Sequence, residues 1–205
     1  STRKESSAAS DVYKRQDKAY TWGEIEKWLQ RISKFSEEIN VQLSKIQIKG
    51  TAKLDGFAGY DDGEKLYTRG DGNKGSDISR VFQRGLGILN DSERGQGPGE
   101  IVVKRSYFED YLSNHFEYPR NFQASLIKEK ELDKFAREAI DAKAALFVPF
   151  KQLPFWQGNI DEFKNQFLDI VIKLEEGVDF DIDGVVFEIV NPELKEFMGS
   201  NRKFH

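Results

Sequence analysis

Residues 47–55 alternate between apolar and polar side chains and run into Lys53-Leu54-Asp55-Gly56. Alternation with a period of two is typical of a half-buried β-strand, and Asp-Gly favours a turn. The pattern therefore predicts a strand that carries a lysine close to its end. Taken alone, Lys53 is more simply interpreted as a surface lysine beside an ordinary turn, so its meaning depends on the motifs further along the chain.

A glycine-punctuated segment, Thr68-Arg69-Gly70-Asp71-Gly72-Asn73-Lys74-Gly75, comes next. Glycines let backbone amides approach a ligand closely, and an arginine supplies a permanent positive charge for phosphate. Before this segment, Asp62-Gly63 separates two short strand-like stretches, 57–60 and 66–68, and predicts a two-residue β-hairpin. The two motifs together favour a phosphate-binding site near a lysine.

The remaining pattern alternates helices and strands. Residues 87–98 are rich in glycine and polar side chains and are expected to form a loop. Hairpins with helices between them favour an α+β fold with largely antiparallel sheets. The expected helices are about 22–38, a short one from about 76, 106–115, 130–143 and 161–175, and the further expected strands are 99–104, 145–150 and 184–190.

Composition narrows the possible classes of protein. The 205 residues include sixteen Phe and three Trp, which is enough for a sizeable core in one domain. The net charge of −4 does not indicate nucleic acid, so any DNA contact must come from a local patch. Cysteine is absent, which excludes disulfides, thiolate zinc sites and a cysteine nucleophile.

The first sixteen residues differ from the rest, because residues 1–16 are polar and without periodicity. We interpret them as a disordered tail or an artefact, and residues 17–205 as one domain. The sequence has no apolar run of membrane-spanning length and no visible signal peptide. A cytoplasmic, reducing location is therefore expected.

The pair of motifs resembles the adenylation domain of NAD-dependent DNA ligases, which are covalent nucleotidyltransferases. In that family the lysine of K-x-D-G takes AMP from NAD, so the resemblance implies that Lys53 is the catalytic nucleophile. A lysine amine attacks phosphorus only when deprotonated, which partial burial and neighbouring cations favour. The resemblance further implies a nucleotidyltransferase fold of two sheets flanked by helices, with Lys53 and Asp183 facing a nucleotide cleft between the sheets.

Three later segments extend the resemblance. Gly99-Glu100-Ile101-Val102 resembles the family's G-E-[VI] strand, whose glutamate contacts the ribose or the metal site. Pro119-Arg120-Asn121 is similar to N-P-R-N, where the arginine serves phosphate and DNA ends. Asp183-Gly184-Val185-Val186 is similar to D-G-V-V, whose aspartate lines the adenylate pocket. Glu100 and Arg120, taken alone, would be a solvated strand-edge residue and an exposed turn residue.

The implied site also needs an aromatic ring for adenine. The family places it between P-R-N and D-G-V-V, where Phe150 is our candidate, and the alternative is that Phe147 and Phe150 both lie in the core. Stacking contributes about 1–3 kcal/mol per base. NAD and Mg²⁺ are the implied cofactors, with Asp55 and Glu100 as metal ligands. The implied nucleotide-binding residues are Thr51, Leu54, Asp55, Gly56, Arg69, Glu100, Arg120, Phe150 and Asp183.

Several positions depart from the family pattern. Thr51 stands where the family has a glutamate, and Glu188 stands where it has a lysine near phosphate. Glu175 replaces an arginine, with Lys173 as a possible substitute. The sequence stops at His205, before the family's last motif, so we expect a fragment or a compact, phage-like ligase with weak adenylation.

Three functions stay open at this stage. The first is NAD-dependent adenylation by a monomer that serves to seal nicked double-stranded DNA. The second is an ATP-dependent polynucleotide ligase or a capping enzyme, but those enzymes carry K-x-D-G-x-R, and Ala58 stands at the arginine position. The third is a catalytically inactive module that binds nucleotide or DNA, which the glutamate at position 188 and the missing C-terminal lysine both motivate.

Overall fold

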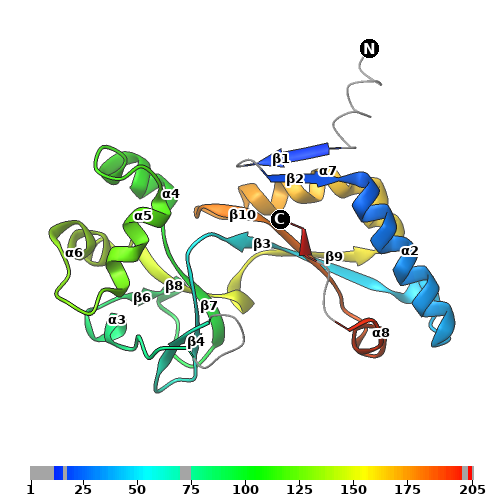
Figure 1. Ribbon diagram of the computed structural model, residues 1–205, viewed down its shortest axis with the longest axis horizontal. Helices are drawn as coiled ribbons and strands as arrows, with labels where there is room; N and C mark the ends of the chain where they lie inside the picture. Colours follow the sequence, from blue (N-terminus) through cyan, green and yellow to red (C-terminus); the bar gives the residue numbers. More distant parts are fainter. Residues whose placement is uncertain (1–11, 16–17, 70–74, 200–202, 205) are drawn as a thin grey trace, which may run out of the picture. The chain divides into compact units, whose positions relative to one another are not determined.

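The protein consists of two compact units, as the computed structural model shows (Figure 1). The structure describes residues 12–15, 18–69, 75–199 and 203–204. Unit 1 takes its described residues from 1–53, 154–178 and 182–205, and unit 2 takes them from 54–153 and 179–181. The boundary between the units thus falls directly after Lys53, inside the first motif.

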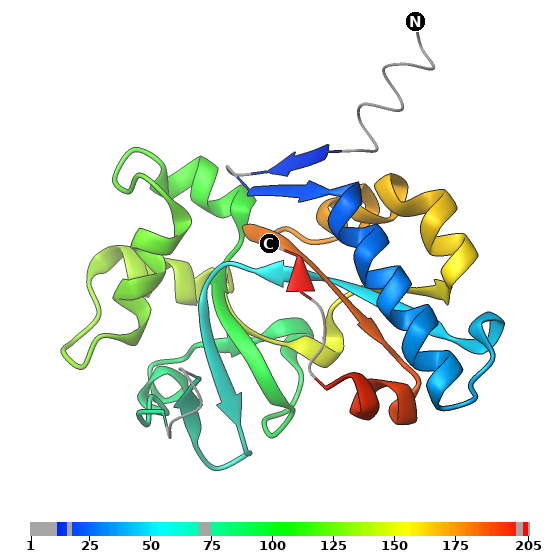
Figure 2. The same ribbon diagram turned by 45° about the vertical axis from the view of Figure 1, so that its right-hand side comes forward.

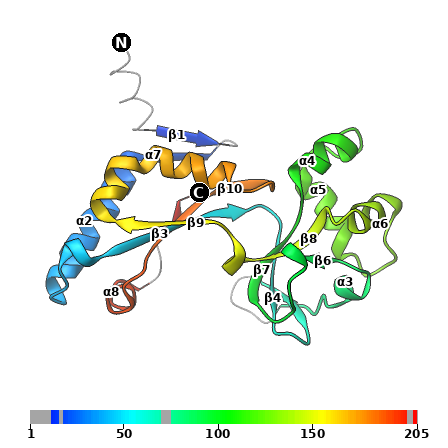
Figure 3. The same ribbon diagram turned by 180° about the vertical axis from the view of Figure 1, so that it is seen from behind.

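Unit 1 is built on a four-stranded sheet of order β11-β10-β3-β9. Strand β3 pairs antiparallel with β9, and β10 pairs antiparallel with β11. Figures 2 and 3 show β10 and β9 on either side of β3. A separate antiparallel pair is formed by β1 and β2. The strands are β1 (Val12–Arg15), β2 (Lys18–Thr21), β3 (Gln47–Leu54), β9 (Phe155–Asn159), β10 (Ile182–Ile189) and β11 (Lys203–Phe204).

Two long helices cover one face of this sheet. Helix α2 (Trp22–Glu38) buries an apolar stripe at helical spacing, and α7 (Ile160–Glu176) starts with a capping box. In that box Asn159 accepts from the Glu162 amide and Glu162 accepts from the Asn159 amide, which satisfies two otherwise unpaired donors. A short 3-10 turn, η1 (Leu43–Lys45), and helix α8 (Pro192–Met198) complete the unit.

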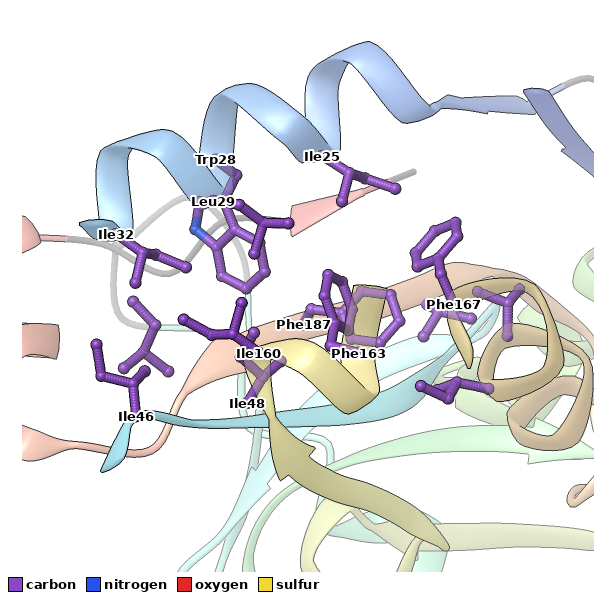
Figure 4. Packing of buried hydrophobic residues seen from close by; sticks show 14 of the residues in the cluster. Ile25, Trp28, Leu29, Ile32, Ile46, Ile48, Ile160, Phe163, Phe167 and Phe187 are labelled. Atoms are coloured by element: carbon purple, nitrogen blue, oxygen red, sulfur yellow. The ribbon is translucent and has the colours of Figure 1, made fainter. Parts of the chain in front are cut away.

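The core of unit 1 is aromatic at its centre. Phe163 on α7 contacts Trp28 of α2 and Phe187 of β10, with ring centroids 6.0 and 4.9 Å apart. Figure 4 shows these rings between the aliphatic residues of α2 and those of β3. Each large ring removes much apolar area from water, so this cluster fixes α2 and α7 on the sheet.

Unit 2 is built on a five-stranded sheet of order β5-β4-β7-β8-β6. Strands β5, β4, β7 and β8 pair antiparallel in turn, and β6 pairs parallel with β8. The strands are β4 (Phe57–Asp61), β5 (Leu66–Thr68), β6 (Gly87–Ile88), β7 (Gly97–Val103) and β8 (Ala145–Pro149).

Short helices cover one face of this second sheet. Its core joins Ile101 and Phe147 of the sheet to Val81, Phe122 and Ile140 of three helices. The helical elements are α3 (Arg80–Gln83), η2 (Leu89–Asp91), α4 (Arg105–Tyr107), the π-helical η3 (Phe108–Leu112), α5 (Pro119–Gln123), η4 (Ala124–Ile127), α6 (Lys134–Asp141) and η5 (Phe150–Gln152). None of the helices in the described parts of the chain is long and apolar enough to cross a membrane.

The expected α+β class with largely antiparallel sheets is confirmed, as are the long helices and the strand that carries Lys53. The hairpin at 57–68 is also confirmed, but its loop spans 62–65, because Asp62 accepts from the amides of Glu64 and Lys65 and so closes a longer turn. The helix expected from 76 begins at Arg80 instead, and the expected loop 87–98 contains β6 and η2. Strand β1 falls within the expected tail, whose boundary at residue 16 stays a prediction.

Candidate functional site

Strand β3 presents Lys53 on the face opposite the core of unit 1. Its residues alternate strictly between buried and half-buried, and Lys53 belongs to the half-buried set with Thr51. The buried set packs so closely that a Cβ on Gly50 would lie 2.6 Å from the Phe187 ring. A one-residue slip would move every side chain to the other face, so this packing fixes the face on which the lysine lies.

Lys53 forms an ion pair with Asp183 of the neighbouring strand β10. The Lys53 Nζ and Asp183 Oδ1 atoms are 3.8 Å apart, and the two side chains are 37% and 20% exposed. Directly after the aspartate, Gly184 has φ +146°, a backbone conformation that favours glycine. The K-L-D-G and D-G-V-V motifs therefore meet through their charged residues within unit 1. The nucleotide cleft that both residues were expected to face stays a prediction.

An aromatic residue that the sequence analysis did not single out lies beside this pair. Phe155 of β9 is directly opposite Thr51 in the antiparallel register and is 57% exposed. The ammonium of Lys49 lies 4.5 Å from the centre of the Phe155 ring, within the range of a cation–π contact. The face of the sheet that carries Lys53 thus also carries an exposed ring, contributed by β9.

Asp55, two residues after the lysine, belongs to unit 2 and is bound through its backbone and its side chain. Its amide donates to the carbonyl of Asp181 (2.9 Å), and its carbonyl accepts from Gln123 Nε2 (2.9 Å). Its carboxylate Oδ1 lies 3.4 Å from Arg120 Nη1. The predicted residues Asp55 and Arg120 are therefore together, and the pairing uses the arginine of the P-R-N segment.

The segment that supplies the Asp181 carbonyl is itself tied to α4. The backbone amide of Arg105 donates to the Asp179 carbonyl (2.9 Å), and its Nη2 donates to the Phe180 carbonyl (2.6 Å). Ser106 donates to the Asp179 carboxylate from both its amide and its hydroxyl. These contacts hold residues 179–181 in unit 2, just before the strand that carries Asp183.

Gly56 is required by the neighbouring strand β7. A Cβ at this position would lie 2.2 Å from the carbonyl oxygen of Ile101 and 3.1 Å from Cγ of Glu100. The family resemblance implied that this glycine binds nucleotide, and the structure supplies a packing reason for it. The same contacts place the carboxylic side chain of Glu100, which is 7% exposed, next to the Asp-Gly turn.

Arg69 lies at the end of a row that crosses the sheet of unit 2. Its amide donates to the carbonyl of Ala58 on β4. Ala58 is opposite Glu100 on β7, and Glu100 is opposite Val148 on β8. Residues directly opposite in a sheet project from the same face, so Arg69, Ala58 and Glu100 share one face. The Arg69 side chain is exposed. Predicted residues Arg69 and Glu100 are thus separated by a single strand.

The glycine-rich loop is closed at its base. Thr68 donates from its amide to the Ser76 carbonyl, and the Ser76 amide donates to Thr68 Oγ1. A Cβ on Gly75 would lie 1.5 Å from the Thr68 carbonyl oxygen, so only glycine fits there. Gly70 and Gly72, which the sequence analysis placed near phosphate, lie outside the described residues.

The two aromatic candidates differ in burial. Phe147 is fully buried in the core of unit 2 and packs edge-on against Phe82. Phe150 is half-buried and begins η5, directly after β8. The alternative that both rings are core therefore holds for Phe147, and the assignment of Phe150 to adenine stays a prediction.

The departures from the family pattern have structural explanations in unit 1. Lys195 of α8 places its Nζ 3.2 Å from Glu188 Oε2. The negative charge of Glu188, which stands where the family has a lysine, is therefore paired with a cation of the same unit. Glu175 is 5% exposed on α7, whereas Lys173 is exposed. Residues two positions apart on a helix project from nearly opposite sides, so the side chain of Lys173 does not take the position of Glu175.

The structure thus gathers the predicted residues in two groups, one in each unit. Lys53, Thr51 and Asp183 lie in unit 1, and the remaining predicted residues that the structure describes lie in unit 2. They include Leu54, which is buried at the end of β3, directly after the boundary. Within the described ranges, no three His, Cys, Asp or Glu side chains are grouped so that they could hold a metal ion. The expected convergence of Arg69, Glu100, Arg120 and Phe150 on Lys53 stays a prediction.

Comparison with known proteins finds relatives that are named DNA ligase, without a stated nucleotide donor. The chain is 62% identical over 189 residues to a protein named DNA ligase from Ruthia magnifica subsp. Calyptogena magnifica. It is similar to DNA ligases. A DNA ligase of Vesicomyosocius okutanii is also 62% identical, and one of Shewanella baltica is 50% identical, each over 189 residues.

These alignments cover 92% of this chain but only 31%, 30% and 29% of the three relatives. The chain therefore spans about a third of the length of the curated relatives that it matches. No protein-family model matches it. The similarity therefore concerns a segment of DNA ligase and not its whole length.

Proposed function

We propose that this chain is the adenylation segment of an NAD-dependent DNA ligase. The observation that carries the proposal is the Lys53–Asp183 ion pair, because it brings together two motifs that the family resemblance identifies separately. The similarity to proteins named DNA ligase supports the ligase class. The Thr68–Gly75 motif and the presence of Ala58, rather than arginine, favour NAD over ATP as the nucleotide donor.

In the proposed reaction, Nζ of Lys53 attacks the α-phosphorus of NAD. The ammonium must first lose a proton, because only the neutral amine has a lone pair for phosphorus. A nitrogen–phosphorus bond forms as the bond to the bridging oxygen breaks, and nicotinamide mononucleotide leaves with that electron pair on its phosphate. The product is AMP joined to Lys53 through a phosphoramidate.

The other predicted residues bind and orient the nucleotide in this proposal. Arg69 and Arg120 would neutralise phosphate charge, and Phe150 would stack on adenine. Thr51 would hydrogen-bond the base through its hydroxyl, and Leu54 would line the site beside Asp55 and Gly56. Asp183 holds Nζ of Lys53 on the exposed face of the sheet.

We propose that two carboxylates of unit 2 would hold magnesium. Mg²⁺ is usually bound by one or two carboxylates together with substrate phosphates, rather than by a cage made only of protein. Asp55 and Glu100, on either side of the Gly56 contact with β7, provide such carboxylates. When bound, the metal would neutralise charge on the phosphates.

In a whole ligase, the AMP would pass to a DNA 5′-phosphate, and the 3′-hydroxyl of the nick would then displace it. Nicked double-stranded DNA is therefore the proposed partner, in a monomeric protein of the cytoplasm. The inactive-module alternative rests on Glu188, which differs in charge from the family's lysine. Its ion pair with Lys195 offers a reason why the reversed charge would be tolerated in an active protein.

The test is to incubate the chain with Mg²⁺ and either NAD or ATP and to measure its intact mass. We expect a gain of one adenylyl group with NAD, accompanied by release of nicotinamide mononucleotide, and no gain with ATP. A gain of mass with ATP alone would mean that ATP, and not NAD, is the nucleotide donor. No gain with either nucleotide would favour the inactive module.

A further inference from the structure

Gln123 is a buried amide that joins the first motif to the sheet of unit 2. Its side chain is 0% exposed. Its Oε1 accepts from the Val103 amide at 2.9 Å, and its Nε2 donates to the Asp55 carbonyl at 2.9 Å. A buried amide without partners costs free energy, so this pair of bonds fixes the orientation of the side chain.

Gln123 and Arg120 act on Asp55 from the same helix. They are three residues apart on α5, a spacing that places both side chains on one face. Arg120 reaches the carboxylate of Asp55 and Gln123 reaches its carbonyl, while Asp181 accepts from its amide. The helix therefore binds the aspartate at its main chain and at its charge.

We infer that Gln123 is a positioning residue for Asp55 in the adenylation reaction. This inference rests on the proposed function and adds to it a residue that no motif indicated. The glutamine sets the main chain of the Asp-Gly turn, so that the Asp55 carboxylate faces the guanidinium of Arg120. A glutamine can donate to the carbonyl and accept from the Val103 amide without carrying a charge at any pH.

The discriminating variant is Gln123→Glu, which has nearly the same shape. An ionised glutamate still accepts from Val103 but repels the Asp55 carbonyl, whereas a protonated glutamic acid can donate to it. The adenylation rate of the Gln123→Glu variant, relative to that of the parent, should therefore be highest at acid pH. This relative rate should fall as the pH rises and the new carboxyl group loses its proton. Gln123→Met is the second variant, because it loses both bonds and introduces no buried charge.

The matched control is Ser125→Ala in the adjoining turn η4. Ser125 is 4% exposed and donates to the Phe122 carbonyl at 2.6 Å, so the variant loses a buried hydrogen bond of the same region that does not involve Asp55. Thermal unfolding of all variants shows that each is folded at the assay temperature. Any common loss of stability is thereby separated from an effect on the turn.

The experiment measures the rate of adenylation at saturating NAD, the half-saturating NAD concentration and amide hydrogen exchange in a peptide covering residues 54–58. We expect Gln123→Glu at pH 8 and Gln123→Met to be about 10–100-fold slower than the parent at roughly unchanged half-saturating NAD. Exchange in the peptide should rise in both, and Ser125→Ala should match the parent in rate and exchange.

Equal slowing in Ser125→Ala, or a parental rate in both Gln123 variants, would overturn the inference. If the parent forms no AMP adduct, the proposed function fails, and the exchange measurement still decides the positioning role. Faster exchange at 54–58 in the Gln123 variants alone would support it, and exchange equal to that of Ser125→Ala would refute it.

Discussion

The two charged residues of the Lys53-Leu54-Asp55-Gly56 motif are held in different ways. Lys53, in unit 1, is the residue before the last of β3 and forms an ion pair with Asp183 at 3.8 Å. Asp55, in unit 2, is bound through its amide, its carbonyl and its carboxylate. Lys53 is the proposed nucleophile, which must lose a proton and reach phosphorus, whereas a residue that orients charge needs a fixed main chain.

The largest expected effect falls on Lys53. Lys53→Arg keeps the positive charge but removes a usable nucleophile, because a guanidinium is not deprotonated in proteins. We expect complete loss of the AMP adduct in intact-mass measurements, with a circular dichroism spectrum like that of the parent. An adduct that persists in this variant would remove Lys53 from the mechanism.

The next effect concerns the stability that one buried ion pair gives to unit 2. Asp61 is 1% exposed and accepts from Arg94, Gly95 and Gly63. Asp61→Asn removes the charge that faces Arg94 and should lower the free energy of unfolding by about 3 kcal/mol. Urea denaturation measures this, and a loss below about 1 kcal/mol would show that the ion pair contributes little.

The same residue gives a pH dependence. Burial raises the pKa of Asp61, but the hydrogen bonds from Arg94, Gly95 and Gly63 outweigh burial and hold the pKa below its ordinary value of 3.8. A lowered folded-state pKa contributes stability above the ordinary pKa, and that stability is lost as pH falls through the folded value. The parent should therefore lose more stability below about pH 4 than the Asp61→Asn variant does.

A smaller effect is expected from the fixed half of the motif. Asp55→Asn keeps the backbone bonds to Asp181 and Gln123 but removes the charge opposite Arg120. We expect adenylation to slow about 10–100-fold with little change in stability. Asp141→Asn is the control, because it alters a carboxylate of the same unit that pairs with Arg137 instead. Equal slowing in the control would mean that the charge of Asp55 has no special role.

The smallest effect concerns the reversed charge in unit 1. Glu188→Lys brings two ammonium groups together at Lys195, so stability should fall by about 0.5 kcal/mol, as for an exposed ion pair. Adenylation should not increase, because the cation of Lys195 already lies beside position 188. The double variant Glu188→Lys with Lys195→Glu should restore the stability, and a marked rise in adenylation in the single variant would show that Glu188 impairs the site.

Local patterns in the sequence predicted the elements that bury one face. The spacing of Trp22, Ile25, Trp28 and Ile32 predicted α2, and the alternation in 47–55 predicted β3, because each pattern repeats with the period of its element. Helix α5 and strand β9 were missed. Helix α5 is shorter than two helical turns, and β9 shows no alternation of apolar and polar residues, so neither has a period that the sequence reveals.

The site was predictable only where a motif lies within a continuous segment. Lys53 and Asp183 were predicted through their own motifs, and their pairing results from adjacent strands. Gln123 could not be predicted, because its partners Asp55 and Val103 lie 68 and 20 residues away along the chain. Lys195 was missed for the same reason, since its pairing with Glu188 depends on where α8 packs against β10.

The central claim is that Lys53 takes the adenylyl group of NAD. The most direct measurement uses NAD that carries an isotopic label in either the adenylate phosphate or the nicotinamide phosphate, followed by peptide mapping by mass spectrometry. The account predicts that the adenylate label alone is retained, on the peptide that contains Lys53. Retention of the nicotinamide label, or an adenylyl group on any other residue, would contradict it.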